Sequence, residues 1–220
     1  VPTLPSTMRK THKIAGTEPQ SGNNRYYQFC TSWPCETLVA QTWDTDLAYQ
    51  MGDAVGKEML EYGVVFWLAP ALNIHRNPLC GRNFEYYSED PVLTGNMAAS
   101  ITLGVQSHEG CYVTLKHFAA NNQETNRVGI NETISPRALE EIYLPGFKAC
   151  VTEGNVKTVM SAYNKINGVP CTESTWLLGD KLRKEWGFDG FVVSDWGAVA
   201  NPVKALVGGN DLVMPGPHEW

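Results

Sequence analysis

Phe191-Val192-Val193-Ser194-Asp195-Trp196 is the stretch of sequence from which the fold prediction starts. Its first three residues are aromatic or β-branched, as is typical of a buried strand, and a carboxylate and a large aromatic ring follow shortly after. The pattern recurs upstream, where Val113-Thr114-Leu115 precedes Lys116-His117 and a strand predicted over 156–162 precedes Tyr163-Asn164. Apolar runs that end in polar or aromatic clusters indicate parallel strands whose carboxyl ends converge on one site.

Helices are predicted between these strands. Apolar residues recur at helical spacing over Asp46–Tyr62, with Asp44 or Thr45 as the N-terminal cap and Gly63 as the C-terminal stop. The other predicted elements are helices over 91–109, 135–151 (kinked at Pro145) and 174–186, a buried strand over 64–68, and strands over 111–115 and 211–214. Alternating strands and helices predict an α/β fold, here a TIM-like (β/α) barrel.

The length of the chain limits how much of a barrel it forms. A complete (β/α)8 barrel takes about 250 residues, and this chain has 220. We therefore expect a barrel that is incomplete or collapsed at its first strand. Residues 1–35 lack periodicity and predict an irregular segment, and residues 36–220 predict the barrel domain.

Composition and charge argue against several classes of function. The chain has 17 basic and 23 acidic residues, a net charge of −6, and no basic tract longer than two residues, so we expect no nucleic-acid partner. No apolar run approaches the ~18 residues of a membrane span. The six cysteines show no metal-binding spacing, and no nucleotide or metal motif is present, so we expect neither cofactor nor metal. We expect a soluble chain, either cytoplasmic or secreted.

Asp195 is the leading candidate for chemistry. A carboxylate on a rigid strand end suits a nucleophile that attacks a sugar carbon. The ring of Trp196 offers a platform for the apolar face of a pyranose. The alternative interpretation of Asp195 is the N-cap of a following helix.

Lys116 and His117 are adjacent, so both side chains face one ligand only if the strand ends or bends there. The alternative for His117 is a core histidine with a satisfied ring. A buried ammonium needs a partner, and Asp195 or Glu85 is the predicted partner of Lys116.

Three further residues are candidates for binding. The guanidinium groups of Arg82 and Arg127 present planar forks of donors that match vicinal hydroxyls. The alternative for Arg82 is a structural salt bridge with a neighbouring carboxylate, which the sequence offers at Glu85, Glu89 and Asp90. Tyr163 is a candidate to hydrogen-bond and orient the nucleophile, and its alternative is a core tyrosine with a solvated hydroxyl.

Together these motifs resemble glycoside hydrolase family 3, the family of β-glucosidases and their relatives. The resemblance covers most of the chain from about Thr37 onward. Its segments are WLAPALNIHRNPLCGRNFEYYSEDP (Trp67–Pro91), LKHFAANNQETNR (Leu115–Arg127), VMSAYNKINGVP (Val159–Pro170), WGFDGFVVSDWGA (Trp186–Ala198) and GNDLVMPG (Gly209–Gly216).

The resemblance implies a retaining, cofactor-free hydrolysis of β-glucosides through a covalent glycosyl-aspartate intermediate. Asp195 matches the family's nucleophile, and Trp196 and Met160 match residues near the scissile bond. The residues that match the family's contacts to the sugar in the first subsite are Arg82, Lys116, His117, Arg127 and Tyr163. The alternatives are a β-xylosidase or α-arabinofuranosidase of the same family, and a non-catalytic sugar-binding fragment.

The sequence departs from the family pattern in two places. The first strand of the family ends in a motif like DGPxGxR, whereas the corresponding stretch here is Pro5–Lys10, in which only Arg9 matches. The resemblance identifies no acid/base residue in this chain, because the family usually carries that residue on a following α/β sandwich domain. We expect that domain to be absent from these residues, so the acid/base would come from it or from a second chain.

Overall fold

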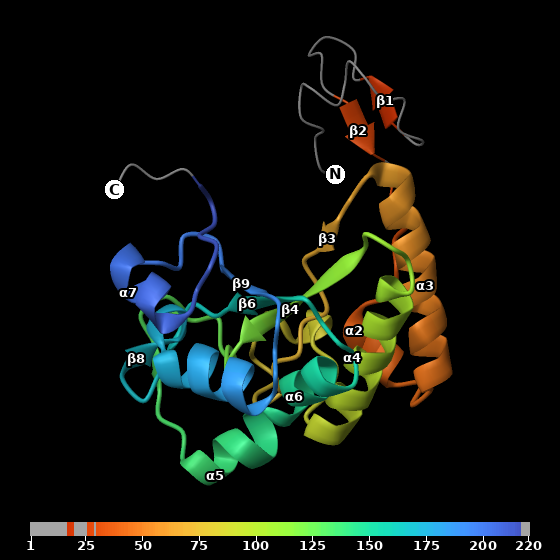
Figure 1. The fold of residues 1–220 in the computed structure, drawn as a ribbon. Coiled ribbons are helices and arrows are strands. Elements are labelled where there is room, and N and C mark those ends of the chain that lie inside the picture. Colours follow the sequence, from red (N-terminus) through yellow and green to blue (C-terminus); the bar gives the residue numbers. More distant parts are fainter. Residues whose placement is uncertain (1–16, 20–25, 29, 217–220) are drawn as a thin grey trace.

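The computed structural model describes residues 17–19, 26–28 and 30–216 (Figure 1). Its centre is a sheet of four parallel strands in the order β3-β4-β6-β9. These strands are β3 (Phe66–Trp67), β4 (Tyr112–Phe118), β6 (Thr158–Ser161) and β9 (Phe191–Ser194). The predicted α/β fold is confirmed, and the described strands form an open sheet rather than a closed barrel.

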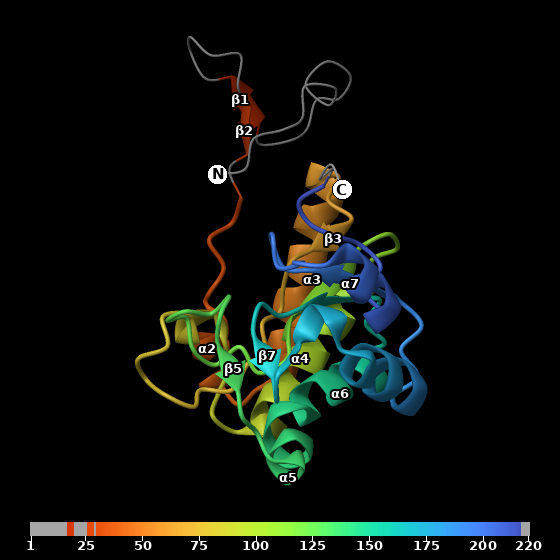
Figure 2. The same cartoon turned by 90° about the vertical axis from the view of Figure 1, so that its left-hand side faces the viewer.

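Helices connect the strands and cover one face of the sheet. Helix α3 packs on α4, α4 packs on α6, and both α4 and α6 contact β4; Figure 2 shows α4 beside α6. The helices and turns are α2 (Glu36–Ala40), α3 (Thr45–Tyr62), η1 (Asn83–Glu85), α4 (Pro91–Gln106), α5 (Pro136–Ala138), η2 (Leu139–Tyr143), α6 (Pro145–Thr152), η3 (Cys171–Glu173), η4 (Thr175–Glu185) and α7 (Pro202–Gly208). No helix of the described ranges combines the length and apolarity needed to cross a bilayer.

Local capping explains where the helices begin and end. The Asp44 side chain accepts a hydrogen bond from Leu47 N at 3.0 Å, and Gly63 ends α3 in the left-handed conformation, as predicted. The helix predicted over 135–151 begins with its Ser135 cap, but it divides into α5, a wide π-type turn (η2) and α6. The break lies at Pro145, which lacks the N–H that a continuous helix requires.

The main core forms where alternate strand residues meet the helices. Val113 and Leu115 of β4, Val159 of β6 and Val192 of β9 belong to one buried cluster with residues of α4 and α6. Their neighbours along the strands point to the opposite face because successive strand residues alternate. The opposite face carries Thr114, Thr158, Met160 and Val193.

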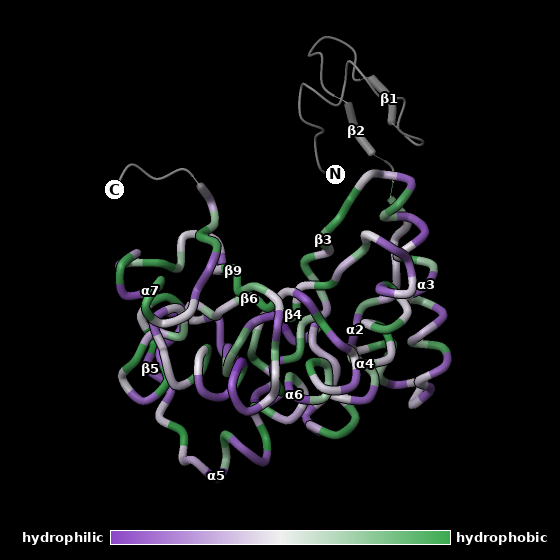
Figure 3. Tube along the Cα trace, in the orientation of Figure 1, coloured by the Kyte–Doolittle hydropathy of each residue, from purple (hydrophilic) through white to green (hydrophobic). Residues whose placement is uncertain are grey.

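Two predicted strands differ in the structure. Of residues 64–68 only β3 is a strand, and Val64, Val65, Phe66 and Leu68 are 38–48% exposed rather than buried. The apolar colour of this segment is visible in Figure 3. Among the described strands β3 pairs only with β4, at the edge of the sheet, and a short apolar run does not reveal that place. Residues 211–214 make a single bridge, between Val193 and Leu212.

The N-terminal segment is only partly described. Strands β1 (Thr17–Pro19) and β2 (Tyr26–Gln28) pair antiparallel, where an irregular segment was predicted. The stretch 5–10, with Arg9, lies outside the described residues. A second small sheet contains β5 (Asn131–Glu132), β7 (Lys165–Ile166) and β8 (Val169–Pro170).

The tight packing of α3 on α4 provides a test of this architecture. A methyl group at Gly104 of α4 would overlap the Tyr49 carbonyl oxygen of α3. We expect Gly104→Ala to lower the free energy of unfolding by about 1–3 kcal/mol, because backbone atoms on both helices must move apart. Urea denaturation of the purified chain measures this change.

The matched control is Gly179→Ala, where the added methyl group would meet only Thr175 Cγ2, at 3.5 Å. This change should leave the free energy of unfolding unchanged or raise it by about 0.5–1 kcal/mol. Equal effects of the two substitutions would contradict the close approach of α3 and α4.

Candidate active site

The bend required by Lys116 and His117 is present at the end of β4. Leu115 pairs with Val159 and Phe118 pairs with Ser161, so three steps along β4 match two along β6. This shift in register is a β-bulge, which places one extra residue in the strand and redirects its side chains. The predicted bend is therefore confirmed.

Asn73, from the loop after β3, fixes this bulge. Its Nδ2 donates to the His117 carbonyl at 2.9 Å, and its Oδ1 accepts from the His117 N–H at 3.0 Å. Both backbone groups of His117 are thus satisfied by one buried side chain in place of a neighbouring strand. The sequence placed Asn73 in a polar cluster after a strand, but nothing in it indicated this role.

The His117 side chain is buried, with 2% of its surface exposed. Its Nδ1 lies 3.3 Å from Asn73 Oδ1 and 3.4 Å from the Tyr86 hydroxyl. Burial lowers the pKa of His117 well below its ordinary value, and the Arg82, Lys116 and Arg127 cations act in the same direction. His117 is therefore a neutral donor or acceptor, not a cation, at pH 7.

Lys116 and Arg82 share one carboxylate. Lys116 Nζ lies 3.1 Å from Glu85 Oε2, and Arg82 Nε pairs with Glu85 Oε1. Although burial acts to raise it, the pKa of Glu85 is held below its ordinary value by these two cations. The predicted Lys116–Glu85 pair and the alternative Arg82–Glu85 salt bridge are both present. One carboxylate does not use all the donors of two cations, so N–H groups remain for a ligand.

Asp195 lies at the end of β9 and is 8% exposed. Its Oδ1 accepts a hydrogen bond from Trp196 N at 2.7 Å. Its Oδ2 is buried without a hydrogen-bond partner among the described residues, and His117 Nε2 lies 3.6 Å away. The N-cap interpretation is wrong, because the next helix, α7, is capped by Asn201.

Burial raises the pKa of Asp195. The Trp196 N–H, the Arg82 and Arg127 cations and the nearby Tyr163 hydroxyl oppose that rise. The carboxylate therefore sits in a site that disfavours its charge but surrounds it with donors and cations. Such an environment is common where a carboxyl group acts on a ligand.

Arg127 and Tyr163 form the wall beside Asp195. The Arg127 guanidinium stacks over the Tyr163 ring at 4.5 Å and donates to Glu124 Oε2 at 2.6 Å. The Tyr163 hydroxyl donates to the Trp196 carbonyl at 2.7 Å, so it holds the backbone that follows Asp195. The predicted contact is a hydrogen bond from Tyr163 to the Asp195 carboxylate, whereas in the structure the hydroxyl orients the Trp196 backbone beside it.

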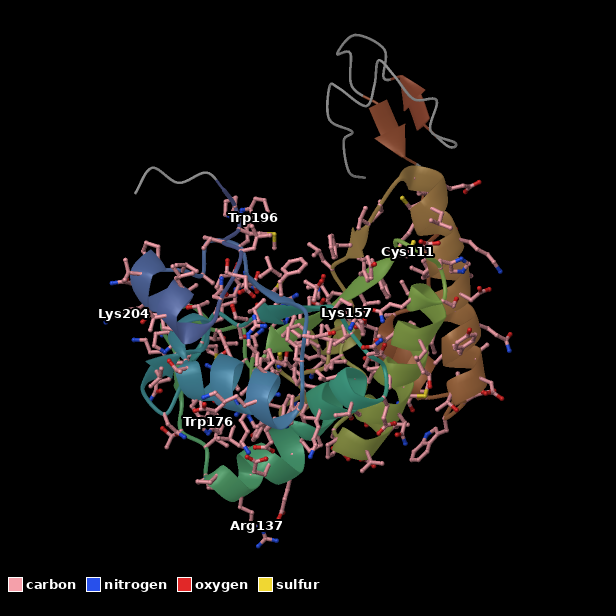
Figure 4. All side chains as sticks on the ribbon, viewed as in Figure 1. Cys111, Arg137, Lys157, Trp176, Trp196 and Lys204 are labelled. Atoms are coloured by element: carbon pink, nitrogen blue, oxygen red, sulfur yellow. The ribbon has the colours of Figure 1, made fainter. Side chains whose placement is uncertain are left out.

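The last two predicted residues lie at different depths. Trp196 is 62% exposed at the upper edge of the molecule in Figure 4, where its ring is accessible to a ligand. Met160 is buried on β6, opposite Val193 and one residue before Ser161, whose carbonyl accepts the Asp195 N–H at 3.1 Å. Over the described part of the chain, no group of three or more His, Cys, Asp or Glu side chains is placed to hold a metal ion.

The desolvated charge of Asp195 predicts a gain in stability when it is removed. Because the pKa of Asp195 is raised in the folded state, folding favours its protonated form, and stability falls as pH rises through that pKa. We expect Asp195→Asn to raise the free energy of unfolding at pH 7, because the neutral amide avoids the desolvation of a charge. The gain should shrink as the pH approaches 4, which urea denaturation at each pH measures.

Asp189→Asn is the matched control. Asp189 is exposed, and its ion pair with Lys157, at 2.7 Å, lowers its pKa. This substitution should lower stability at pH 7, the opposite sign. An Asp195→Asn variant that is less stable than the parent at pH 7 would rule out a desolvated carboxylate.

Comparisons with known proteins agree with this geometry. Residues 6–211 match the sequence model described as the glycosyl hydrolase family 3 N-terminal domain. β-Glucosidase A of Butyrivibrio fibrisolvens is 49% identical over 184 residues, and an exo-α-(1→6)-L-arabinopyranosidase of Bifidobacterium longum is 48% identical over 185 residues. Each alignment covers 84% of this chain, but only 22% and 24% of the two relatives.

Solved structures show the same relationship. The structure of β-glucosidase 3B from Thermotoga neapolitana in complex with glucose superposes with a TM-score of 0.86 at 55% identity. That superposition covers 90% of this chain and 28% of the other. The chain thus spans about a quarter of the length of these relatives. With a family match over nearly its whole length, this chain belongs to glycosyl hydrolase family 3.

Proposed function

We propose that these residues are the nucleophile-bearing part of a retaining glycoside hydrolase that removes terminal β-D-glucosyl residues from β-glucosides. The observation that carries the proposal is Asp195 Oδ2, a buried carboxylate oxygen without a hydrogen-bond partner in the described structure. Buried polar atoms are normally paired, so an unpaired one at a strand end calls for a functional explanation. An uncommitted oxygen is what a nucleophile needs.

In the proposed reaction, Asp195 Oδ2 attacks the anomeric carbon, and the bond from that carbon to the leaving oxygen breaks. The product is a glycosyl ester of Asp195, which water then hydrolyses to release the sugar and restore the carboxylate. Oδ1 keeps its hydrogen bond from Trp196 N throughout, and this bond fixes the orientation of the carboxylate. Its raised pKa reflects a desolvated, and hence more reactive, carboxylate.

The sugar would be held by the donors around Asp195. Arg82, Lys116 and Arg127 supply N–H groups to hydroxyls, and the neutral His117 ring adds a donor or acceptor beside them. The exposed ring of Trp196 offers an apolar platform at the mouth of the site, and Met160 supplies buried apolar lining. Tyr163 holds the Asp195–Trp196 backbone in place.

The acid/base residue is proposed to lie outside these residues, on a further domain or a second chain. Two nearby carboxylates are poorly suited to the role. Glu85 is held ionised by Arg82 and Lys116, and Glu124 is paired with Arg127. A general acid needs a pKa near the working pH, whereas the pKa of Glu85 is lowered by its adjacent cations. The site's partner, whether domain or chain, would thus complete the catalytic pair.

A second substrate class has support from one relative. The Bifidobacterium longum protein named an exo-α-(1→6)-L-arabinopyranosidase is nearly as similar to this chain as the β-glucosidases are. An L-arabinopyranosyl ring lacks the hydroxymethyl group of glucose, as does xylose. β-Xylosidase activity, α-arabinofuranosidase activity and non-catalytic sugar binding are three more candidate functions for the same site.

Covalent trapping tests the nucleophile without requiring the acid/base. 2-Deoxy-2-fluoro-β-D-glucosyl fluoride carries a leaving group that departs without protonation, and its 2-fluoro group slows hydrolysis of the ester. We expect stoichiometric labelling of Asp195 in the 220-residue chain, located by mass spectrometry of its peptides. Asp195→Asn should take no label, and the exposed control Asp189→Asn should be labelled as the parent is.

The same reagent distinguishes the sugars. Glucose should protect Asp195 from labelling at lower concentrations than xylose or L-arabinose. Stronger protection by L-arabinose would replace glucoside with arabinopyranoside as the substrate class. Glucose binding in calorimetry without any label would favour a sugar-binding fragment, and neither label nor glucose binding would contradict the proposed function.

A further inference from the structure

The short turn that carries Arg82 and Glu85 is held by a hydroxyl from another element. The Thr37 hydroxyl of α2 lies 2.7 Å from the Asn83 carbonyl and 2.6 Å from the Tyr86 carbonyl. Asn83 is the first residue of η1, and Tyr86 directly follows its last residue. Within the turn the Asn83 carbonyl also accepts from the Tyr86 N–H at 3.1 Å, so Thr37 links an already hydrogen-bonded turn to α2.

His75 supplies a second donor to the same pair of carbonyls. Its Nε2 lies 2.8 Å from the Asn83 carbonyl and 3.1 Å from the Tyr86 carbonyl. Carbonyl oxygens only accept, so His75 must carry its proton on Nε2. Thr37 and His75 thus donate to the same two carbonyls, and the Thr37 hydroxyl also lies 3.3 Å from the Phe84 carbonyl.

The start of α2 also contacts the strand end that faces this turn. Next to Thr37, the buried carboxyl of Glu36 accepts from Ala71 N through Oε1 at 3.2 Å. Ala71 forms a parallel bridge to Lys116, whose ammonium pairs with Glu85. One end of α2 therefore contacts both halves of the Lys116–Glu85–Arg82 group.

We propose that Thr37 is a positioning residue for sugar binding, which acts with His75 to hold η1 so that Arg82 and Glu85 stay aligned with Lys116. The inference rests on the proposed function, since it gives the alignment a purpose. Thr37 does not touch the sugar. Without its hydroxyl, the two carbonyls keep the His75 ring and, at Asn83, the Tyr86 N–H as donors. The turn then opens more often, and Arg82 and Glu85 lose their alignment with Lys116.

Hydrogen exchange tests the positioning directly and does not depend on sugar binding. In Thr37→Val, which keeps the shape and removes the hydroxyl, amide exchange over 82–86 should accelerate about tenfold while exchange in α4 stays unchanged. Thr37→Ser should restore slow exchange. The control is Thr42→Val, since Thr42 is exposed and its hydroxyl bonds only to near neighbours. It donates to the Val39 carbonyl at 2.7 Å and accepts from the Asp44 N–H at 3.2 Å.

Calorimetric measurement of glucose binding by the same variants tests whether the alignment of Arg82 and Glu85 serves sugar binding. Thr37→Val should weaken glucose binding about tenfold, with Thr37→Ser and Thr42→Val near the parent. In a Glu85→Gln background, Thr37→Val should weaken glucose binding less than it does in the parent, because Thr37 acts through the turn that carries Glu85. If Thr37 were merely structural, Thr37→Val would weaken binding by the same factor in both backgrounds.

The outcomes separate the two proposals. Unchanged exchange over 82–86 in Thr37→Val, or accelerated exchange with unchanged glucose binding, overturns the positioning role. A parent chain that neither binds glucose nor takes the fluoroglucosyl label overturns the proposed function, and with it the purpose assigned to Thr37. In that case accelerated exchange would describe only a structural clamp.

Discussion

Two hydrogen bonds from Asn73 to the backbone of His117 are the constraint on which the site depends. A regular strand would direct Lys116 and His117 to opposite faces of the sheet. The bulge at the end of β4 redirects them, and Asn73 pairs the His117 N–H and carbonyl that the bulge removes from the ladder. Lys116 then reaches Glu85, while the His117 ring lies beside Asp195.

The titratable groups around Asp195 differ in charge state and in partners. Glu85 binds two cations, and the cations and burial keep His117 neutral. Asp195 is left as a carboxylate with one unpartnered oxygen and a pKa that burial raises. Such a group reduces stability and is retained in proteins mainly where it contributes to function. The positioning role proposed for Thr37 extends the same logic, because it fixes the turn that supplies Arg82 and Glu85.

Much of this arrangement was predictable from sequence, and the exceptions have physical reasons. The polar clusters after apolar runs predicted the converging strand ends, and the cost of burying an ammonium predicted the Lys116–Glu85 pair. Periodicity did not show that β3 is an edge strand, since that depends on which neighbours the chain supplies. The segment 211–214 bonds β9 through one bridge and through the Asp211 carboxylate, which accepts the Val192 N–H at 2.6 Å, a side-chain contact that an apolar pattern does not reveal. Asn73 and Thr37 were missed because their partners are backbone atoms 44 and 46–49 residues away.

Measurement of the His117 pKa by NMR titration tests most directly whether Asn73 builds this site. His117→Gln assigns the signal. We expect the His117 ring in the parent chain to titrate below the ordinary value of about 6.5. In a folded Asn73→Ala variant, the strand end should loosen and the pKa of His117 should return toward that value. A His117 pKa at or above the ordinary value in the parent, or one that Asn73→Ala leaves unchanged, would contradict the account.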